Sequence, residues 1–305
     1  MKSPTPLYST ELGACYCADA LDFLPTIPDA SIDLVVTSPP YALHFKKEYG
    51  NVDQQEYVDW FLPFAREFKR VLKPDGSFVL NIGGAWTPGA PLRSLYHYRL
   101  ALALVDDVGF KLCQEFFWYN PAKMPAPAEW VNVRRIRVKD SVEYIFWLSA
   151  SEFPKADNSK VLQTYSRDME RLIKRGIKNS KRPSGHNIKP SFAADKGGSI
   201  PPNLIECGNN ESNSRYIKES KASGRKVHPA RFPAELPRFF IEFLTDPGDL
   251  VMDPFAGSNT TGAAAERLGR KWIAVEKSSE YATDSELRFT EPEVTNGNGQ
   301  QLLFG

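Results

Sequence analysis

Hydrophobic residues along the chain follow two spacings, and together these predict an α/β protein. Short apolar runs bounded by turn-forming residues are typical of buried strands, and an apolar residue at every third or fourth position is typical of helices. The predicted strands cover residues 15–19, 32–36, 77–82, 110–118, 141–148, 250–252 and 272–275. The predicted helices cover residues 55–71, 94–107, 165–174, 233–244 and 263–268. Residues 1–10 are expected to form an unstructured lead, and residues 73–76 a turn.

The hydrophobic pattern is interrupted near residue 151. From there to about residue 226 the chain is rich in Lys, Ser, Asn, Gly and Pro. This composition predicts an insertion or a small appended domain rather than part of a core sheet. We therefore expect a core made of residues 11–150 and 227–290, with the segment 151–226 inserted between them and a disordered tail at 291–305.

Charge is distributed unevenly between these parts. The net charge is only +1, but residues 151–226 hold 16 Lys and Arg against 8 Asp and Glu, a balance of +8. The remainder holds 22 against 29, a balance of −7. A basic block joined to an acidic body indicates a polyanionic partner that touches one part of the molecule. A solvated, lysine-rich loop region is the simpler alternative.

The composition is otherwise that of an ordinary globular protein, with 42% hydrophobic and 25% charged residues among 305. No apolar run approaches the ~18 residues of a membrane span, and no signal peptide opens the chain, so a cytoplasmic protein is expected. The four cysteines form no CxxC pair and have no His at metal-ligand spacing. We expect them to be reduced thiols, and we expect no metal site.

The first candidate site follows the predicted strand 32–36 and reads Thr37-Ser38-Pro39-Pro40-Tyr41. The two prolines hold the backbone extended and remove two N–H donors, so the carbonyls around them are expected to be free acceptors. A hydroxyl lies on one side of this rigid pair and an aromatic ring on the other. Such a site can hold a planar group that bears an amine, with its hydrogens accepted and its face stacked. A plain proline turn after a strand is the alternative.

The second candidate site is the loop that joins the predicted strand 250–252 to the helix 263–268. It reads Asp253-Pro254-Phe255-Ala256-Gly257-Ser258-Asn259-Thr260-Thr261-Gly262, and Glu276 ends the next strand about twenty residues later. A glycine-containing loop before a helix, followed by an acid placed to accept from ribose hydroxyls, is half of a nucleotide site. The loop lacks the full set of three glycines of a dinucleotide motif, and the lysine of a P-loop is absent. An adenosyl-type ligand without a phosphate chain is therefore favoured, and a plain strand–helix turn is the alternative.

These two motifs together resemble motifs IV and I of the amino-methyltransferases that act on DNA. Their order, with the catalytic motif first and the cofactor loop last, is that of the β class, and the match is best with its PvuII-type, N4-cytosine-specific members. The resemblance covers most of the chain and includes residues 46–50, 182–186, 198–204 and 228–233. It implies a Rossmann-like, S-adenosylmethionine-dependent methyltransferase fold with a circularly permuted motif order. It also implies that residues 151–226 form the inserted DNA target-recognition region.

The resemblance also assigns roles to individual residues. It implies that Ser38, Pro39, Pro40 and Tyr41 hold a flipped base, and that no covalent intermediate with the enzyme is needed. The residues expected to bind S-adenosyl-L-methionine are Asp19, Thr37, His228, Arg231, Phe232, Asp253, Pro254, Phe255, Gly257, Ser258, Asn259, Thr260, Thr261 and Glu276. The residues expected at double-stranded DNA are Lys46, Lys47, Arg134, Arg135, Arg182 and His186. A cognate restriction endonuclease that reads the same short palindrome is an expected functional partner, without a stable complex.

The chain departs from the pattern at Asn81, where the resemblance would place an Asp that takes a proton through the serine. Asn carries no charge. We therefore expect Ser38 to accept a hydrogen bond from the target amine and to position that amine, and we expect the proton to leave to solvent. Family members with Ser at position 38 are mostly cytosine enzymes and those with Asp are mostly adenine enzymes. N4-cytosine is therefore favoured, with N6-adenine as the alternative.

Two further classes share parts of this pattern. Methyltransferases that act on RNA or on protein glutamine also use Asn/Asp-Pro-Pro-Tyr, but the basic segment and the permuted order argue against them. A catalytically silent DNA-binding module would keep the basic segment and bind no cofactor.

Overall fold

The computed structural model describes residues 4–42, 52–176, 190–209, 217, 222 and 233–289. The chain divides into two compact units. The first combines Met1–Ala156 with Asn203–Gly305, and the second is Asp157–Pro202.

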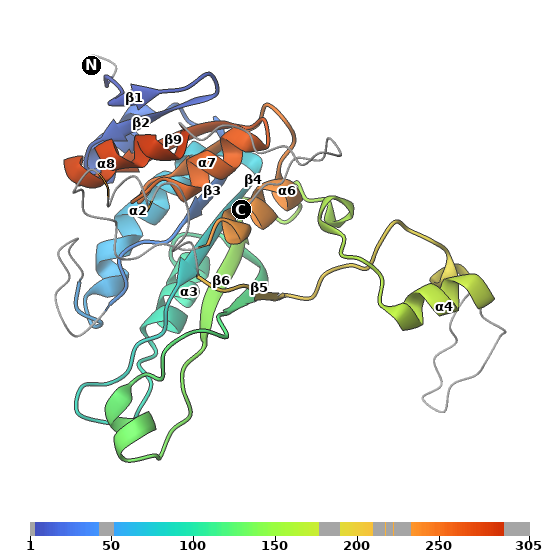
Figure 1. Ribbon diagram of the computed structural model, residues 1–305. Coiled ribbons are helices and arrows are strands. Elements are labelled where there is room, and N and C mark those ends of the chain that lie inside the picture. Colours follow the sequence, from blue (N-terminus) through green and yellow to red (C-terminus); the bar gives the residue numbers. More distant parts are fainter. Residues whose placement is uncertain are drawn as a thin grey trace. The chain divides into compact units, whose positions relative to one another are not determined.

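Among the described residues, the first unit holds one mixed sheet of nine strands, shown in Figure 1. In spatial order the strands are β1 (Tyr8–Ser9), β2 (Gly13–Cys17), β9 (Lys271–Glu276), β8 (Leu250–Asp253), β3 (Ile32–Thr37), β4 (Leu72–Ile82), β6 (Val142–Ser149), β5 (Lys111–Tyr119) and β7 (Leu204–Glu206). The five neighbouring strands β2, β9, β8, β3 and β4 all run parallel, whereas β6 runs antiparallel to β4. The carboxyl ends of β2, β9, β8, β3 and β4 therefore meet the amino end of β6 at one edge.

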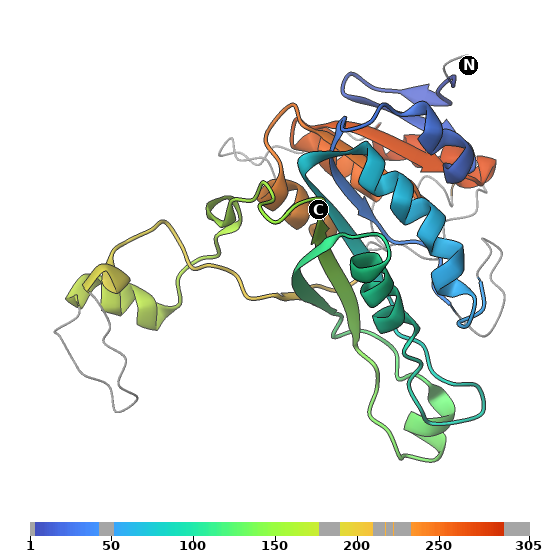
Figure 2. The same ribbon diagram turned by 180° about the vertical axis from the view of Figure 1, so that it is seen from behind.

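Helices cover both faces of this sheet, as the two opposite views in Figures 1 and 2 show. One face carries α1 (Ala20–Phe23), α2 (Tyr57–Val71) and α3 (Tyr96–Asp106), and the other carries α6 (Glu235–Leu244), α7 (Thr260–Arg267) and α8 (Ser279–Ser285). Side chains alternate along a strand, so neighbouring residues serve different faces. Phe78 of β4 packs against Phe68 of α2, and Trp147, on β6 beside Val79, packs against Phe243 of α6. This doubly covered sheet is the predicted α/β architecture.

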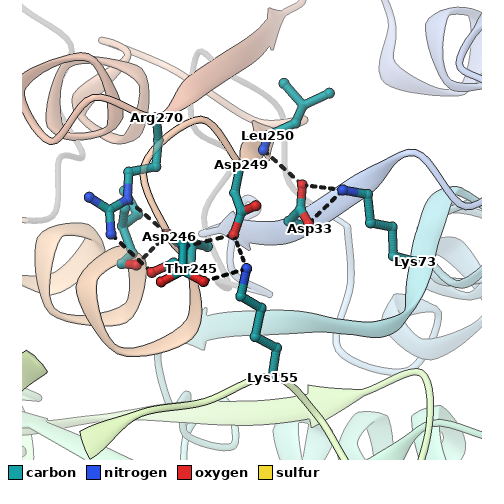
Figure 3. Close-up of polar contacts among 9 residues, drawn as sticks. Asp33, Lys73, Lys155, Thr245, Asp246, Asp249, Leu250 and Arg270 are labelled. Atoms are coloured by element: carbon teal, nitrogen blue, oxygen red, sulfur yellow. Dashed lines mark hydrogen bonds and ion pairs between the residues drawn. The ribbon is translucent and has the colours of Figure 1, made fainter. Parts of the chain in front are cut away.

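Ion pairs tie the strands together at their amino ends, opposite the edge where the carboxyl ends meet (Figure 3). Asp33, near the start of β3, is 8% exposed and accepts from Lys73 Nζ at 2.7 and 2.9 Å. Its Oδ2 also accepts from the backbone N–H of Leu250, the first residue of β8, at 2.9 Å. One carboxylate thereby joins three adjacent strands.

Lys155 makes a second set of ion pairs beside the contacts of Asp33 (Figure 3). Its ammonium lies 2.8 Å from Asp246 Oδ2 and 2.6 Å from Asp249 Oδ2, in the turn between α6 and β8. Burial lowers the pKa of an ammonium, but here the two carboxylates together raise it. Lys155 therefore stays charged and fixes this turn.

The predicted unstructured lead is wrong at Tyr8 and Ser9, which form β1 against β2. The Tyr8 ring is buried, and its hydroxyl lies 2.6 Å from Ser285 Oγ. The hydroxyl also accepts from Asn259 Nδ2 at 2.9 Å. Burial of one aromatic ring with a satisfied hydroxyl explains why so short a strand forms.

The predicted turn at residues 73–76 is also wrong, because the extended conformation of β4 continues through it. The register explains the sequence signal: Ile32 pairs with Leu72, but Leu34 pairs with Ser77. The extra residues of β4 bulge out of the ladder, so a Pro-Asp-Gly sequence is accommodated within the strand. Strand β7, which pairs in parallel with β5, was not predicted.

The second unit contains α4 (Arg167–Arg175), close to the predicted helix 165–174. The Ser166 hydroxyl caps it by accepting from the Met169 N–H at 3.2 Å. A short antiparallel bridge joins Gln163 to Ser199.

Within the described ranges of the whole chain, no helix combines the length and the apolar character that crossing a membrane requires.

Candidate functional site

A buried carboxylate, Asp253, joins the ends of β3 and β8 at the edge where the parallel strands finish. Its Oδ1 accepts from the Thr37 hydroxyl and its Oδ2 from the Thr261 hydroxyl, both at 2.7 Å. Asp253 is only 2% exposed, and this burial raises its pKa to about 6 against the hydrogen bonds that lower it. The motif after β3 and the loop after β8 are thus locked to one another.

Glu276, at the end of β9, is held by backbone donors on both of its oxygens. Oε2 accepts from the Gly257 N–H and Oε1 from the Ser278 N–H, both at 2.8 Å. Burial raises the pKa of this carboxyl, and the backbone donors work in the opposite direction. Gly257 has φ +53°, a conformation that favours glycine and lets the loop turn toward the acid.

Asp19, two residues after the end of β2, caps helix α1. Its Oδ1 accepts from the Leu21 N–H at 3.0 Å, and its Oδ2 lies 2.9 Å from Lys277 Nζ. The Lys277 ammonium holds the pKa of this carboxyl below its usual range. Lys277 directly follows Glu276, so Asp19 and Glu276 share this part of the edge.

The other residues of the predicted cofactor loop hold its shape. Asn259 caps α7 by accepting from the Gly262 N–H at 3.0 Å, and the carbonyl of Ser258 accepts from Arg288 Nε at 2.6 Å. The Phe255 ring lies 5.0 Å from the Phe64 ring of α2. Pro254 and Thr260 are buried.

A second network surrounds Ser38, the next residue after Thr37. Ser38 Oγ lies 3.2 Å from the Tyr41 hydroxyl, and Asn81 Nδ2 donates to Tyr41 at 2.9 Å and to Ser38 at 3.3 Å. The Tyr41 hydroxyl donates to Glu143 Oε2 at 2.7 Å, and Glu143 Oε1 is paired with Lys123 Nζ at 2.9 Å. Burial and the neighbouring carboxylate raise the pKa of Tyr41 well above its ordinary value.

Backbone contacts fix the position of the Tyr41 ring and change one expectation about the prolines. A Cβ on Gly83 would lie 2.4 Å from the Tyr41 ring, so only glycine permits this approach. The Pro40 carbonyl, expected to be a free acceptor, accepts from the Tyr57 hydroxyl of α2 at 2.8 Å. That expectation is therefore wrong for Pro40, because α2 supplies a buried donor.

Comparison with known proteins identifies the family of this chain. A family model described as DNA methylase matches residues 32–287. The type II methyltransferase M.PvuII of Proteus hauseri is 53% identical over 293 residues, which cover 95% of this chain and 87% of the relative. The chain belongs to the DNA methylase family.

Solved structures agree with this membership. A structure titled PvuII DNA methyltransferase (cytosine-N4-specific) has a TM-score of 0.78 and 47% identity, covering 96% of this chain and 91% of that one. TTHA0409 of Thermus thermophilus, complexed with S-adenosyl-L-methionine, has a TM-score of 0.54 and 23% identity, covering 90% and 93%, and shows the fold alone. The predicted family and the predicted Rossmann-like fold are confirmed.

Several predicted site residues of this DNA methylase lie outside the described residues: Lys46, Lys47, Arg182, His186, His228, Arg231 and Phe232. Arg134 and Arg135 are described and exposed, in the connection between β5 and β6. Arg134 pairs with Glu129 at 2.8 Å and lies 5.0 Å from the Trp130 ring. Their predicted contact with DNA stays a prediction.

Three residues of the Ser38 network were missed by the sequence analysis: Tyr57, Lys123 and Glu143. The only signal for Glu143 is a lone carboxylate beside the apolar run of strand β6. Its place beside Tyr41 depends on the antiparallel pairing of β6 with β4, in which Asn81 opposes Ile145. A strand direction of this kind cannot be read from local pattern.

Proposed function

We propose that this DNA methylase transfers a methyl group from S-adenosyl-L-methionine to the exocyclic N4 of cytosine within a short palindromic site of duplex DNA. The observation that carries this proposal is the adjacency of Thr37 and Ser38. Thr37 is bonded to Asp253, in the predicted cofactor loop, and Ser38 belongs to the predicted base site. One peptide bond therefore couples the two halves of a transfer reaction.

The residues at the strand ends suit an adenosyl ligand that carries no phosphate chain. Each oxygen of Glu276 accepts from a backbone N–H, and a carboxylate has about four lone-pair sites, which leaves room to accept from ribose hydroxyls. No lysine stands in the loop 253–262 to neutralise phosphates. We infer that Asp253, Gly257 and Glu276 hold the cofactor, which supplies an electrophilic methyl group when bound.

Ser38 and Pro39 are suited to hold the target amine. The lone pair of this amine is delocalised into the ring, so the amine is a weak nucleophile until both its hydrogens are accepted. The Ser38 hydroxyl can accept one, and the Pro39 carbonyl can accept the other, since that of Pro40 is engaged by Tyr57. Positioning and charge placement then supply most of the rate enhancement.

Tyr41 is proposed to stack on the flipped base. Taking a base out of the duplex costs a few kcal/mol, which aromatic stacking partly offsets. The Tyr41 hydroxyl is fixed by Asn81 and Glu143, so the ring plane is set before the base arrives.

Two observations support cytosine over adenine. Ser rather than Asp precedes the two prolines, and the 47% identical structure is titled cytosine-N4-specific. The basic segment 151–226, with Arg134 and Arg135, is proposed to contact the phosphates. The 53% identical relative is named a type II methyltransferase, so we further propose a cognate endonuclease that recognises the same site.

Methyl transfer to DNA tests the proposal directly. The full chain is incubated with unmethylated duplex DNA and methyl-tritiated S-adenosylmethionine, and tritium in the DNA is measured. Ser38→Ala is expected to lower the rate by about 100-fold, because one acceptor of the amine is lost. The same variant should keep the thermal shift produced by the cofactor.

Ser9→Ala is the matched control, because Ser9 is an exposed serine on β1. It should transfer methyl groups at the wild-type rate. Wild-type protein that binds the cofactor but leaves DNA unlabelled would contradict the proposal.

A further inference from the structure

Glu143 lies behind the proposed base site with both carboxylate oxygens engaged. Its side chain is 14% exposed. Oε2 accepts from the Tyr41 hydroxyl at 2.7 Å and Oε1 is paired with Lys123 at 2.9 Å. A carboxylate accepts hydrogen bonds and an ammonium only donates them, so both contacts have a fixed direction.

This direction propagates to Ser38. Tyr41 has one hydroxyl hydrogen, and Glu143 takes it, so the Tyr41 oxygen can only accept from its other neighbours. Asn81 Nδ2 donates to it at 2.9 Å. Ser38 Oγ, at 3.2 Å, must then be the donor in its contact with Tyr41.

We propose that Glu143 is a positioning residue that makes Ser38 an acceptor for the target amine, an inference that rests on the proposed function. With its own hydrogen turned toward Tyr41, Ser38 presents a lone pair to the substrate. Asn81 donates to both hydroxyls at 3.3 and 2.9 Å, and it cannot set this direction alone because either hydroxyl could still donate to the other. The carboxylate decides between the two arrangements.

Lys123 makes the proposal testable through an inverted network. In Glu143→Gln, the ammonium of Lys123 holds the amide oxygen, which turns the amide NH2 toward Tyr41. Tyr41 then accepts from the amide and gives its own hydrogen to Ser38. The Ser38 hydroxyl would then point its own hydrogen at the target amine, although it has to accept a hydrogen bond from that amine.

The experiment measures kcat and KM for methyl transfer by the full chain. Glu143→Gln is expected to lower kcat by about 100-fold and to leave KM for DNA and for S-adenosylmethionine within about threefold. Adding Lys123→Met to Glu143→Gln frees the amide to rotate its oxygen toward Tyr41. The double variant should recover at least about tenfold in kcat over Glu143→Gln.

The outcomes separate this inference from the function on which it rests. An active wild type with an unchanged kcat in Glu143→Gln overturns the inference alone. If Glu143→Gln lowers kcat and the added Lys123→Met does not recover it, the inference is also overturned. A merely structural carboxylate would show this absence of rescue. A wild type that transfers no methyl group to DNA overturns both.

Discussion

Asp253 is a buried carboxyl in the core of the molecule, at the point where two chain segments meet. Its oxygens accept from Thr37 and Thr261, and burial nevertheless raises its pKa from 3.8 to about 6. Between these two pH values the folded protein keeps a proton that the unfolded chain has lost. The free energy of unfolding therefore falls as the pH rises through this window, and it levels off above pH 6.

Asp253→Asn should remove this pH dependence. Measured by urea unfolding without cofactor, the stability of the variant relative to wild type should rise by about 2 kcal/mol between pH 4.5 and pH 7. The amide has no charge to bury at either pH, which is the physical reason. A stability difference that stays constant over this range would contradict the raised pKa of Asp253.

Asn81 tests the expectation that no proton passes from Ser38 to residue 81. Its Nδ2 donates to both hydroxyls, and among the described residues its buried Oδ1 has no hydrogen-bond partner. Asn81→Asp would lose these donations and place a second carboxylate near Glu143. We expect kcat to stay within about threefold of wild type or to fall. A strong rise in kcat with a shifted pH profile would instead establish a relay.

At the scale of elements, ion pairs hold the amino ends of the strands together, while the carboxyl ends carry the proposed site. Asp33 is 8% exposed and joins β3, β4 and β8 through Lys73 and Leu250. Removing the charged partner of a buried carboxylate leaves an uncompensated charge, which costs far more than loss of an exposed pair.

Lys73→Met is expected to lower the free energy of unfolding by about 2 kcal/mol. Arg171→Met is the control, because its pair with Asp168 is 67% and 92% exposed and should contribute less than about 0.5 kcal/mol. Urea unfolding of the two variants compares them. Equal effects would mean that Asp33 does not depend on its lysine.

Much of this arrangement follows from local pattern, and the remainder depends on contacts distant in sequence. Apolar spacing correctly predicted β3, β8 and α2, and parallel strands bring their carboxyl ends together, which places Thr37 near Asp253. Glu143 reaches Tyr41 only because β6 runs antiparallel to β4. The burial of Tyr8 depends on Ser285, 277 positions away. Neither contact leaves a local signal.

At the scale of the whole molecule, the charge asymmetry gives a measurable property. The segment 151–226 carries +8 and the rest of the chain −7. Phosphate contacts release counterions, so each contact adds about 0.9 to the slope of log affinity against log salt. If this segment binds DNA, its cations should dominate that slope.

Replacing Arg171, Lys174 and Arg175 of α4 by Ala should weaken duplex binding and reduce the salt slope by about 2–3. Replacing the exposed Arg66, Arg99 and Lys111 by Ala changes the net charge equally and should leave the slope nearly unchanged. Fluorescence anisotropy at several salt concentrations measures both. The same loss in the two triple variants would contradict a DNA-binding role for this segment.

The most direct measurement of the proposed activity identifies the modified base. DNA methylated by the purified chain is digested to nucleosides and analysed by mass spectrometry. The result expected is N4-methyldeoxycytidine, present with wild-type protein and strongly reduced with Ser38→Ala. N6-methyldeoxyadenosine in its place, or no methylated nucleoside at all, would contradict the assignment of Ser38 and its neighbours to cytosine N4.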